Sequence, residues 1–324
     1  MDKIVMLSKL YDAGRELLEG KVDLVEAYCD DPDQANGLLE EADGVFLGNQ
    51  PFRAEMLQKH PNLRLIAKQG SGCDNIDVAA ATAAGVPVVL SAGVNARAVA
   101  EHVMLLVLAA NRNLYHYETS LRQGDFQVRS SCTSEEVCGK TIGLIGFGKI
   151  GQAVCGYAKA FGMEAAVYDP GISPKTAEDA GCTYYTELEP FLRRSDTVSI
   201  HVPLTPQTRG IIGAEQLAQM KKGAVLVNCA RGGTVDEAAL YDALAGGHLR
   251  AAGLDVFEQE PARADNPLFR LDNVVATPHC AALTRESSQA MSLVTAQGIL
   301  AVLSGEKWDC VADPSVFASH SHRR

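Results

Sequence analysis

One stretch constrains the fold of this chain more than any other, Thr141-Ile-Gly-Leu-Ile-Gly-Phe-Gly-Lys-Ile-Gly151. It holds the pattern G-x-G-x-x-G at Gly146, Gly148 and Gly151, after a strand-like run and at the start of a helix-like run. In this order, the first glycine permits a tight turn and the second lets the backbone approach a pyrophosphate. The third allows close packing of helix and strand, and the positive helix N-terminus faces the phosphates. The stretch predicts a dinucleotide site.

An acidic residue completes this pattern. The next strand-like run, Ala165-Ala-Val-Tyr-Asp169, ends at Asp169, close to the expected spacing of about 20 residues. A carboxylate there accepts hydrogen bonds from ribose hydroxyls and repels a 2′-phosphate. The closest following cation is Lys175, beyond two prolines. The sequence therefore predicts NAD rather than NADP. The weaker alternative to a dinucleotide site is a turn that is glycine-rich by chance.

Short apolar runs alternate with helix-like segments along most of the chain, which predicts parallel sheets covered on both faces. At 324 residues, the chain exceeds what one core usually holds, about 250–300 residues, so two α/β domains are expected. The expected strands are Ile4–Leu7, Asp23–Tyr28, Gly44–Gly48, Leu63–Lys68, Pro87–Leu90, Thr141–Ile145, Glu164–Tyr168, Thr197–Val202, Ala224–Asn228, Ala251–Val256 and Asn273–Thr277.

A long helix at about 96–114 and a polar, irregular region at 115–140 are expected to separate the two sets of strands. The last long helix is predicted at Arg285–Leu303. Residues 311–324 are predicted to be frayed.

Composition excludes several classes of function. The net charge of -11 opposes binding to nucleic acid or anionic membranes. The longest apolar run, Val103–Ala110, is far shorter than the roughly 20 residues of a membrane span. The start of the chain shows no signal-peptide pattern, and no regulatory domain is expected after the second domain. Nine cysteines without metal-ligand spacing predict free thiols in a cytoplasmic protein with no metal site.

Three further strand ends carry groups that suit chemistry, Arg231, Glu260 and His279, with Asp255 ending the same strand that precedes Glu260. Each has an ordinary explanation, such as a surface charge for the arginine or a hydrogen-bonded core position for the histidine. Ligands of open parallel sheets bind beyond the carboxyl ends of strands, however. Their occurrence at successive strand ends of a dinucleotide domain favours a functional site.

With these features, the sequence resembles the D-isomer-specific 2-hydroxyacid dehydrogenase family, which includes phosphoglycerate dehydrogenases and glyoxylate/hydroxypyruvate reductases. The resemblance runs from about Val45 to Leu303, most of the chain. Besides the glycine pattern, it rests on the motifs Gly70–Asp77, Val99–His102, His201–Thr205, Val227–Gly232, Gly253–Phe257, Glu260–Pro261 and Thr277–His279.

The resemblance implies an α/β fold of two doubly wound parallel-sheet domains, with a Rossmann NAD-binding domain (98–285) inserted in a flavodoxin-like substrate domain (1–97 and 286–324). Its catalytic residues would be Arg231, Glu260 and His279. The cofactor residues would be Gly146, Gly148, Lys149, Ile150, Gly151, Asp169, His201, Pro203, Cys229 and Asp255. The substrate residues would be Lys68, Ser71, Gly72, Arg231 and His279.

The implied reaction is hydride transfer between NAD(H) and a small D-2-hydroxy acid or 2-keto acid. His279 exchanges the hydroxyl proton, Glu260 stabilises the imidazolium, and Arg231 holds the substrate carboxylate. Asp255 is expected to face the nicotinamide carboxamide. Lys68, with Arg53, is expected to receive an anionic C3 group, although a surface charge explains Lys68 equally well.

Other predictions concern assembly and residues near the site. Residues 113–135 resemble an arm through which family members form homodimers, and Phe126 loosely matches its aromatic residue. His102 is predicted to be a hydrogen-bonded structural residue, and Cys229 and Cys280 to be neutral packing thiols.

Two alternative functions stay open, a formate-dehydrogenase-like enzyme and an NAD-sensing, corepressor-like binding protein. Glu260 counts against the first, and the complete catalytic set argues against the second.

Overall fold

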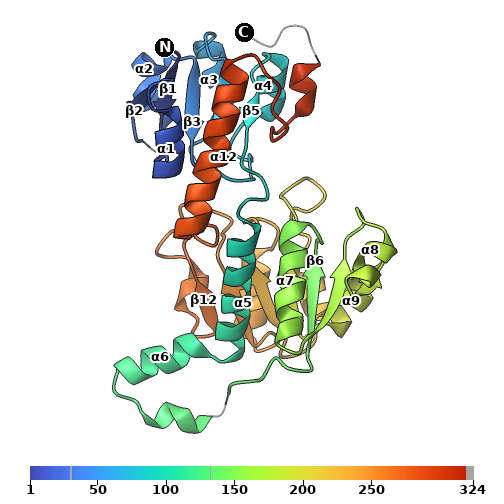
Figure 1. The fold of residues 1–324 in the computed structure, drawn as a ribbon. Coiled ribbons are helices and arrows are strands. Elements are labelled where there is room, and N and C mark those ends of the chain that lie inside the picture. Colours follow the sequence, from blue (N-terminus) through green and yellow to red (C-terminus); the bar gives the residue numbers. More distant parts are fainter. Residues whose placement is uncertain (30, 132, 319–324) are drawn as a thin grey trace. The chain divides into compact units, whose positions relative to one another are not determined.

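A computed structural model describes residues 1–29, 31–131 and 133–318. The contacts divide the chain into two compact units (Figure 1). Unit 1 combines residues 1–95 with 283–324, and unit 2 is the continuous segment 96–282. Each unit is built on one parallel sheet, which confirms the predicted fold class. The domain boundaries expected at 97/98 and 285/286 stay a prediction.

Unit 1 holds a five-stranded sheet in the order β2-β1-β3-β4-β5, the flavodoxin-like order. Helices α1 and α12 cover one face through a core that includes Met6, Phe46 and Ile299, and α2, α3 and α4 cover the other. The elements are β1 Lys3–Met6, α1 Asp12–Leu18, β2 Asp23–Glu26, α2 Asn36–Leu39, β3 Gly44–Leu47, α3 Ala54–Lys59, β4 Leu65–Lys68, α4 Val78–Ala83, β5 Val88–Val89 and α12 Arg285–Leu303.

Unit 2 holds a seven-stranded sheet in the order β12-β11-β10-β9-β6-β7-β8. The chain moves outward from β6 to β7 and β8, and then returns to β9 on the other side of β6. The direction of winding therefore reverses between β6 and β9, where doubly wound sheets bind ligands. The strands are β6 Thr141–Ile145, β7 Glu164–Tyr168, β8 Thr183–Tyr185, β9 Thr197–Ile200, β10 Val225–Asn228, β11 Ala251–Leu254 and β12 Val274–Ala276.

The helices of unit 2 cover both faces of this sheet. Helices α5, α7 and α8 share one buried cluster with the strands, and α9, α10 and α11 share the other. The apolar residues of α5 lie in the first cluster, as expected of its sequence. The helices are α5 Ala96–Asn111, α6 Leu114–Arg122, α7 Lys149–Ala160, α8 Pro174–Asp179, α9 Leu188–Arg194, α10 Ala214–Gln219 and α11 Glu237–Ala245.

Several local predictions were wrong. Residues 114–122, expected to lie mostly in an irregular region, form helix α6, whose residues are all at least partly exposed. Its polar composition concealed the helix because no apolar stripe marks a packed face. Strand β8 and helix α8 were also missed. The tail is not frayed throughout, since Val311 pairs with Val89 and Val316 is buried; residues 319–324 lie outside the described residues.

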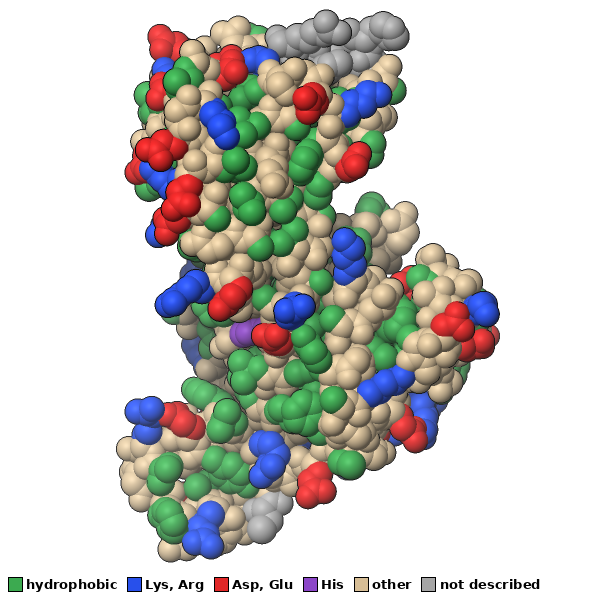
Figure 2. Space-filling view, in the orientation of Figure 1, with side chains coloured by type: hydrophobic (Ala, Val, Ile, Leu, Met, Phe, Trp, Pro, Cys, Tyr) green, Lys and Arg blue, Asp and Glu red, His purple; other side chains and the backbone are tan. Residues whose placement is uncertain are grey.

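Two surface properties bear on function. Within the described residues, no helix is both long and apolar enough to cross a membrane. On the face drawn in Figure 2, cationic and anionic side chains are interspersed rather than separated into single-sign regions.

Candidate active site

The glycine loop lies at the carboxyl end of β6, at the point where winding reverses. Gly146 has φ +94°, and a Cβ there would lie 3.0 Å from the His201 carbonyl oxygen. A Cβ on Gly151 would lie 2.5 Å from the Gly146 carbonyl oxygen. The space beside Gly148 is open to 4 Å, and Gly148 is the N-cap of the 12-residue helix α7. Close packing therefore requires glycine at Gly146 and Gly151, whereas Gly148 leaves room for a ligand.

Asp169 lies directly beside this loop. Its Oδ2 accepts a hydrogen bond from the Phe147 amide at 2.8 Å, and its Oδ1 accepts one from Gly171 at 2.8 Å. The side chain is half-buried, and each carboxylate oxygen can accept further hydrogen bonds. Asp169 is thus held in place by backbone amides, with acceptor capacity left for ribose hydroxyls.

His201 follows β9 on the other side of the winding reversal. Its Nε2 is buried and has no hydrogen-bond partner among the described residues. Burial lowers the pKa of His201 to about 4, so the ring is neutral at pH 7. Pro203, two residues on, is exposed. The open space at Gly148, the held carboxylate and this buried polar atom fit a bound dinucleotide. Lys149 and Ile150 begin α7 between the glycines.

Glu260 and His279 form the central contact of the site. His279 Nδ1 lies 2.6 Å from Glu260 Oε2, and the two side chains are 38% and 31% exposed. The contact is a hydrogen bond of the short length typical of charged pairs, and both groups remain open to solvent. The predicted pairing of these two residues is present in the structure.

The carboxyl of Glu260 is adapted to staying ionised. Burial raises its pKa, but the hydrogen bond and charge of His279, the Phe257 amide and the charge of Arg231 together lower it further. The pKa of Glu260 therefore lies below its ordinary value. An ionised Glu260 accepts a hydrogen bond from His279 Nδ1 and so orients the imidazole ring.

Arg231 lies just after β10 and influences Glu260 through its charge. Its Nη1 donates to the Ala230 carbonyl oxygen at 2.6 Å. The short turn that carries it is fixed by Asn228, whose Nδ2 donates to the Arg231 carbonyl oxygen at 3.0 Å. The three predicted catalytic residues thus come from three neighbouring strand ends of unit 2.

Asp255 anchors the turn that carries His279. It is fully buried, and its side chain accepts hydrogen bonds from the Thr277 hydroxyl at 2.5 Å and from the amides of Cys280 and Ala281, each at 2.9 Å. Its carbonyl oxygen accepts from the His279 amide at 2.7 Å. These bonds hold His279 at φ +49°, a conformation rarely adopted by residues other than glycine. That Asp255 faces the nicotinamide stays a prediction.

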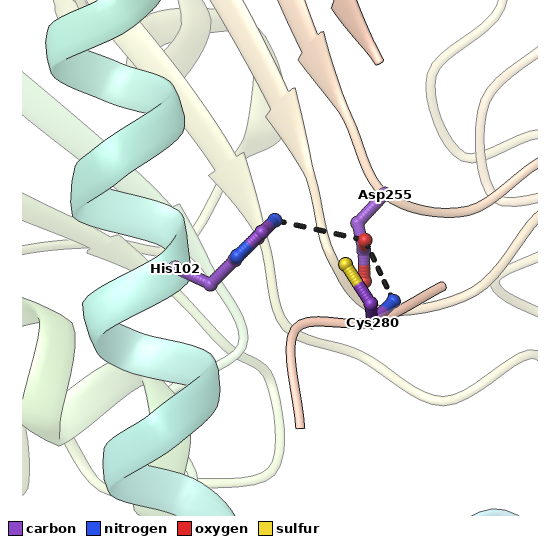
Figure 3. Close-up of side chains that lie close together, drawn as sticks. All are labelled: His102, Asp255 and Cys280. Carbon is purple, nitrogen blue, oxygen red and sulfur yellow. Dashed lines mark hydrogen bonds and ion pairs between the residues drawn. The ribbon is translucent and has the colours of Figure 1, made fainter. Parts of the chain in front are cut away.

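His102, on helix α5, extends this network (Figure 3). Its Nε2 lies 2.9 Å from the Thr277 hydroxyl and 3.6 Å from Asp255 Oδ1. Since the Thr277 hydroxyl donates to Asp255, the His102 ring donates to Thr277. His102, Asp255 and Cys280 lie close enough together to hold a metal ion, but hydrogen bonds within the chain account for the arrangement.

Two cysteines near this network are neutral thiols, as predicted. Burial, with the charge of Asp255, raises the pKa of Cys229 well above its ordinary value. The same two causes raise the pKa of Cys280. Neither thiol is therefore prepared for nucleophilic chemistry.

The predicted substrate residues of unit 1 differ in setting. Lys68, at the end of β4, is only 5% exposed, and its ammonium donates to the Gly48 carbonyl oxygen and, at 3.4 Å, to Asn49 Oδ1. Ser71 is exposed, and its hydroxyl accepts from the Gly93 amide at 3.2 Å. Gly72 follows it in the same loop. The surface-charge explanation of Lys68 is wrong, because this ammonium is buried.

Sequence reasoning missed the part played by Thr277. Thr277 was expected only as the last residue of a strand and as part of the motif Thr277–His279, yet its hydroxyl connects His102 to Asp255. The available signal was a hydroxyl residue between a strand end and a candidate catalytic histidine. That signal is weak, because threonine is common at strand ends for reasons of propensity alone.

Comparison with known proteins agrees with this geometry. Residues 104–281 match the family model described as D-isomer specific 2-hydroxyacid dehydrogenase, NAD binding domain. A D-3-phosphoglycerate dehydrogenase of Methanocaldococcus jannaschii is 43% identical over 310 residues, which are 94% of this chain and 58% of that protein. The chain thus spans just over half of that relative's length.

Two further proteins match over most of their own lengths. A hydroxypyruvate reductase of Thermotoga maritima is 44% identical over 242 residues, 74% of this chain and 78% of that protein. The crystal structure of a D-lactate dehydrogenase from Aquifex aeolicus, complexed with NAD and lactic acid, superimposes with a TM-score of 0.84 at 30% identity. That match covers 94% of this chain and 96% of the other.

Proposed function

This chain belongs to the D-isomer specific 2-hydroxyacid dehydrogenase family, and from that premise we propose that it transfers a hydride between NAD(H) and a small D-2-hydroxy acid or 2-keto acid. The observation that carries the proposal is the 2.6 Å contact between His279 and Glu260, in the unit that also carries the glycine loop. A proton-exchanging pair and a dinucleotide loop on one sheet are the minimum equipment for this reaction.

His279 is the proton-transfer residue in this proposal. In keto-acid reduction, its imidazolium donates a proton to the C2 oxygen, and in the reverse direction its neutral ring accepts the hydroxyl proton. Glu260 stabilises the imidazolium through the Nδ1 contact and leaves Nε2 for the substrate. NAD(H), when bound, accepts or supplies the hydride at C2.

Arg231 binds the substrate carboxylate. Its planar guanidinium can form two parallel hydrogen bonds to that group, which fixes the orientation of C2. The backbone amides at Ser71 and Gly72 in unit 1 are further proposed ligands of the carboxylate, since their loop is glycine-rich and exposed at Ser71.

The cofactor is held by the glycine loop and the strand ends around it. Gly146, Gly148 and Gly151, with Lys149 and Ile150, hold the pyrophosphate at the start of α7. Asp169 binds the ribose hydroxyls and disfavours a 2′-phosphate. His201, Pro203, Cys229 and Asp255 complete the proposed cofactor residues.

The proposed substrates carry a polar or anionic group at C3. Relatives of this chain are named D-3-phosphoglycerate dehydrogenase, hydroxypyruvate reductase and glyoxylate reductase. The cation at the end of β4, Lys68, and Arg53 in the loop before α3 supply positive charge in unit 1. We therefore expect hydroxypyruvate or its phosphorylated form to be preferred over pyruvate.

A cytoplasmic homodimer is the proposed form of the protein. Helix α6 and the segment after it expose the apolar side chains of Leu114, Tyr115, Leu121 and Phe126, between 44% and 60%. An arm without a buried face of its own is stable when a second copy covers it. Light scattering of the purified protein gives the number of copies directly.

The experiment that tests the proposed function is NADH oxidation with a panel of 2-keto acids: glyoxylate, pyruvate, hydroxypyruvate and phosphohydroxypyruvate. We expect turnover with at least one of them and fastest turnover with a substrate polar at C3. NADH binding without turnover on any keto acid supports the NAD-sensing alternative. NAD reduction by formate alone supports the formate-dehydrogenase alternative.

A further inference from the structure

Two cysteines outside the proposed active site lie in contact inside unit 2. Cys155, on helix α7, and Cys182, just before strand β8, have their sulfurs 3.1 Å apart. Their exposed fractions are 3% and 6%, and both belong to the cluster that packs α5 and α7 against the sheet. Both are thiols in this structure.

We propose that Cys155 and Cys182 form a covalent modification site, in which a two-electron oxidant such as hydrogen peroxide converts the two thiols into a disulfide. The Cys155 thiolate first attacks one oxygen of the peroxide, the O–O bond breaks, and the products are a sulfenic acid on Cys155 and hydroxide. The Cys182 sulfur then attacks the Cys155 sulfur, which releases water. Overall, the two thiols lose two electrons and two protons, and the peroxide becomes two water molecules.

The geometry requires little movement. A disulfide bond measures about 2.0 Å, so the sulfurs need to approach by about 1 Å from their 3.1 Å separation. The chain on each side is well anchored, because Cys155 lies inside a helix and the Cys182 amide donates to the Ala177 carbonyl oxygen at 2.9 Å.

The local charges favour attack by Cys155. The hydrogen bond from the Cys182 thiol lowers the pKa of Cys155 below its ordinary value, burial opposes that change, and the charge of Lys159 supports it. Lys159 follows one helical turn later, and its ammonium donates to the carbonyl oxygen of Ala180, two residues before Cys182. The thiolate form of Cys155 is thus favoured relative to an ordinary thiol, whereas the pKa values of Cys229 and Cys280 are raised.

Entry of a small oxidant would require local opening of the chain around Cys182, which lies just before strand β8. Strand β8, which begins at Thr183, is the edge strand of its sheet, and edge elements open locally at lower cost than central strands. Cytosolic disulfides, where they occur, are usually transient and redox-sensing, so a buried pair beside a sheet edge is compatible with a reducing compartment.

The disulfide would join helix α7 to the segment that contacts Asp169 in the proposed nucleotide site. Tyr184, two residues after Cys182, donates from its hydroxyl to the Asp169 carbonyl oxygen at 3.2 Å. The bond would close a loop from residue 155 to residue 182 that contains β7 and α8. Closing a loop of this length restricts the unfolded chain, so oxidation stabilises unit 2.

The test is peptide mapping of the wild-type protein, treated with hydrogen peroxide and then alkylated under denaturing, non-reducing conditions. We expect one linked pair of peptides, containing Cys155 and Cys182, with a mass about 2 Da below the sum of the two thiol peptides. Dithiothreitol should restore both thiols. The melting temperature should rise by about 5–10 °C on oxidation.

Variants separate this site from other thiols. Cys155→Ala and Cys182→Ala should each lose the linked peptides and the rise in melting temperature. Cys138→Ala is the matched control, because Cys138 is exposed, and it should keep both. If both thiols of oxidised wild-type protein remain fully alkylated, or if each is oxidised separately to an acid, the proposal is wrong. The wild-type result decides even if a variant folds poorly.

Discussion

The two parallel sheets of this molecule share an architecture but differ in what their strand ends offer. In unit 2, Glu260 and His279 contact each other while about a third of each side chain stays exposed. In unit 1, Lys68 ends β4 with 5% exposure and is bonded to the Gly48 carbonyl oxygen. Glu260 and His279 are thus hydrogen-bonded and accessible to solvent, whereas Lys68 is hydrogen-bonded and buried.

The difference shows that fold alone does not assign a functional site. A buried ammonium has lost its hydration and must be compensated by acceptors within the protein, so Lys68 contributes to the structure of its loop whatever else it binds. A hydrogen-bonded pair that remains exposed has no such structural necessity. We therefore predict that substitution of Glu260 or His279 in unit 2 mainly alters turnover. Substitution of Lys68 in unit 1 is expected to alter stability as well as substrate binding.

The largest effect is expected for His279→Ala. Turnover should fall by about 10²–10⁴-fold, the usual contribution of a general acid–base group, while NADH binding followed by fluorescence persists. His248→Ala is the matched control, because the His248 ring contacts only the Met220 carbonyl oxygen among the side-chain hydrogen bonds of the described residues. Equal losses in the two variants would remove His279 from the proposed role.

A smaller effect is expected for Asp169→Ala. The preference for NADH over NADPH, measured as the ratio of kcat/KM values, should fall by about 10–100-fold because a charged hydrogen-bond acceptor is lost. Asp179→Ala, at an exposed carboxylate that faces Lys175, serves as the control and should leave the ratio unchanged. Equal use of both cofactors by the wild-type protein contradicts the assignment of Asp169.

Glu260→Gln should lower the rate of keto-acid reduction by about tenfold at neutral pH. Reduction needs the imidazolium, and the amide no longer stabilises it, so the fall in rate with rising pH should move to lower pH. In the wild-type protein the pKa of Glu260 is lowered, so the stability that its ionised form contributes is present above the ordinary value of 4.5 and is lost as the pH falls through the lowered pKa. An unmoved profile excludes this role.

The smallest and most discriminating effect concerns Lys68→Ala. If Lys68 binds an anionic C3 group, KM should rise several-fold more for phosphohydroxypyruvate than for glyoxylate, which lacks C3. The melting temperature should fall in either case, since the Gly48 carbonyl oxygen loses a donor. Equal KM changes for the two substrates show that Lys68 only supports its loop.

Much of the nucleotide-binding half was predictable because its signals are local. The turn at Gly146 and the acidic residue at Asp169 lie within one strand–helix–strand segment, and the structure places β6 and β7 at their predicted residues. The proximity of Glu260 and His279 was expected from the parallel order of strands, because neighbouring carboxyl ends meet at one edge.

Other features depended on contacts between distant segments. The hydrogen bond from His102 to Thr277 joins positions 175 residues apart, and no local pattern specifies it. The burial of Lys68 follows from the packing of the Gly48 loop over the end of β4. Helix α6 was missed because sequence analysis used apolar periodicity, and this helix has no buried residues.

The most direct test of the central account is transfer of deuterium from NADH, labelled on either face of nicotinamide C4, to hydroxypyruvate. The account predicts a D-2-hydroxy acid with deuterium at C2 from one of the two labelled cofactors, and about 10²–10⁴-fold slower formation by His279→Ala. Nuclear magnetic resonance of the product identifies the labelled carbon. A product without deuterium from either cofactor, or an unchanged rate in the variant, would contradict direct hydride transfer coupled to His279.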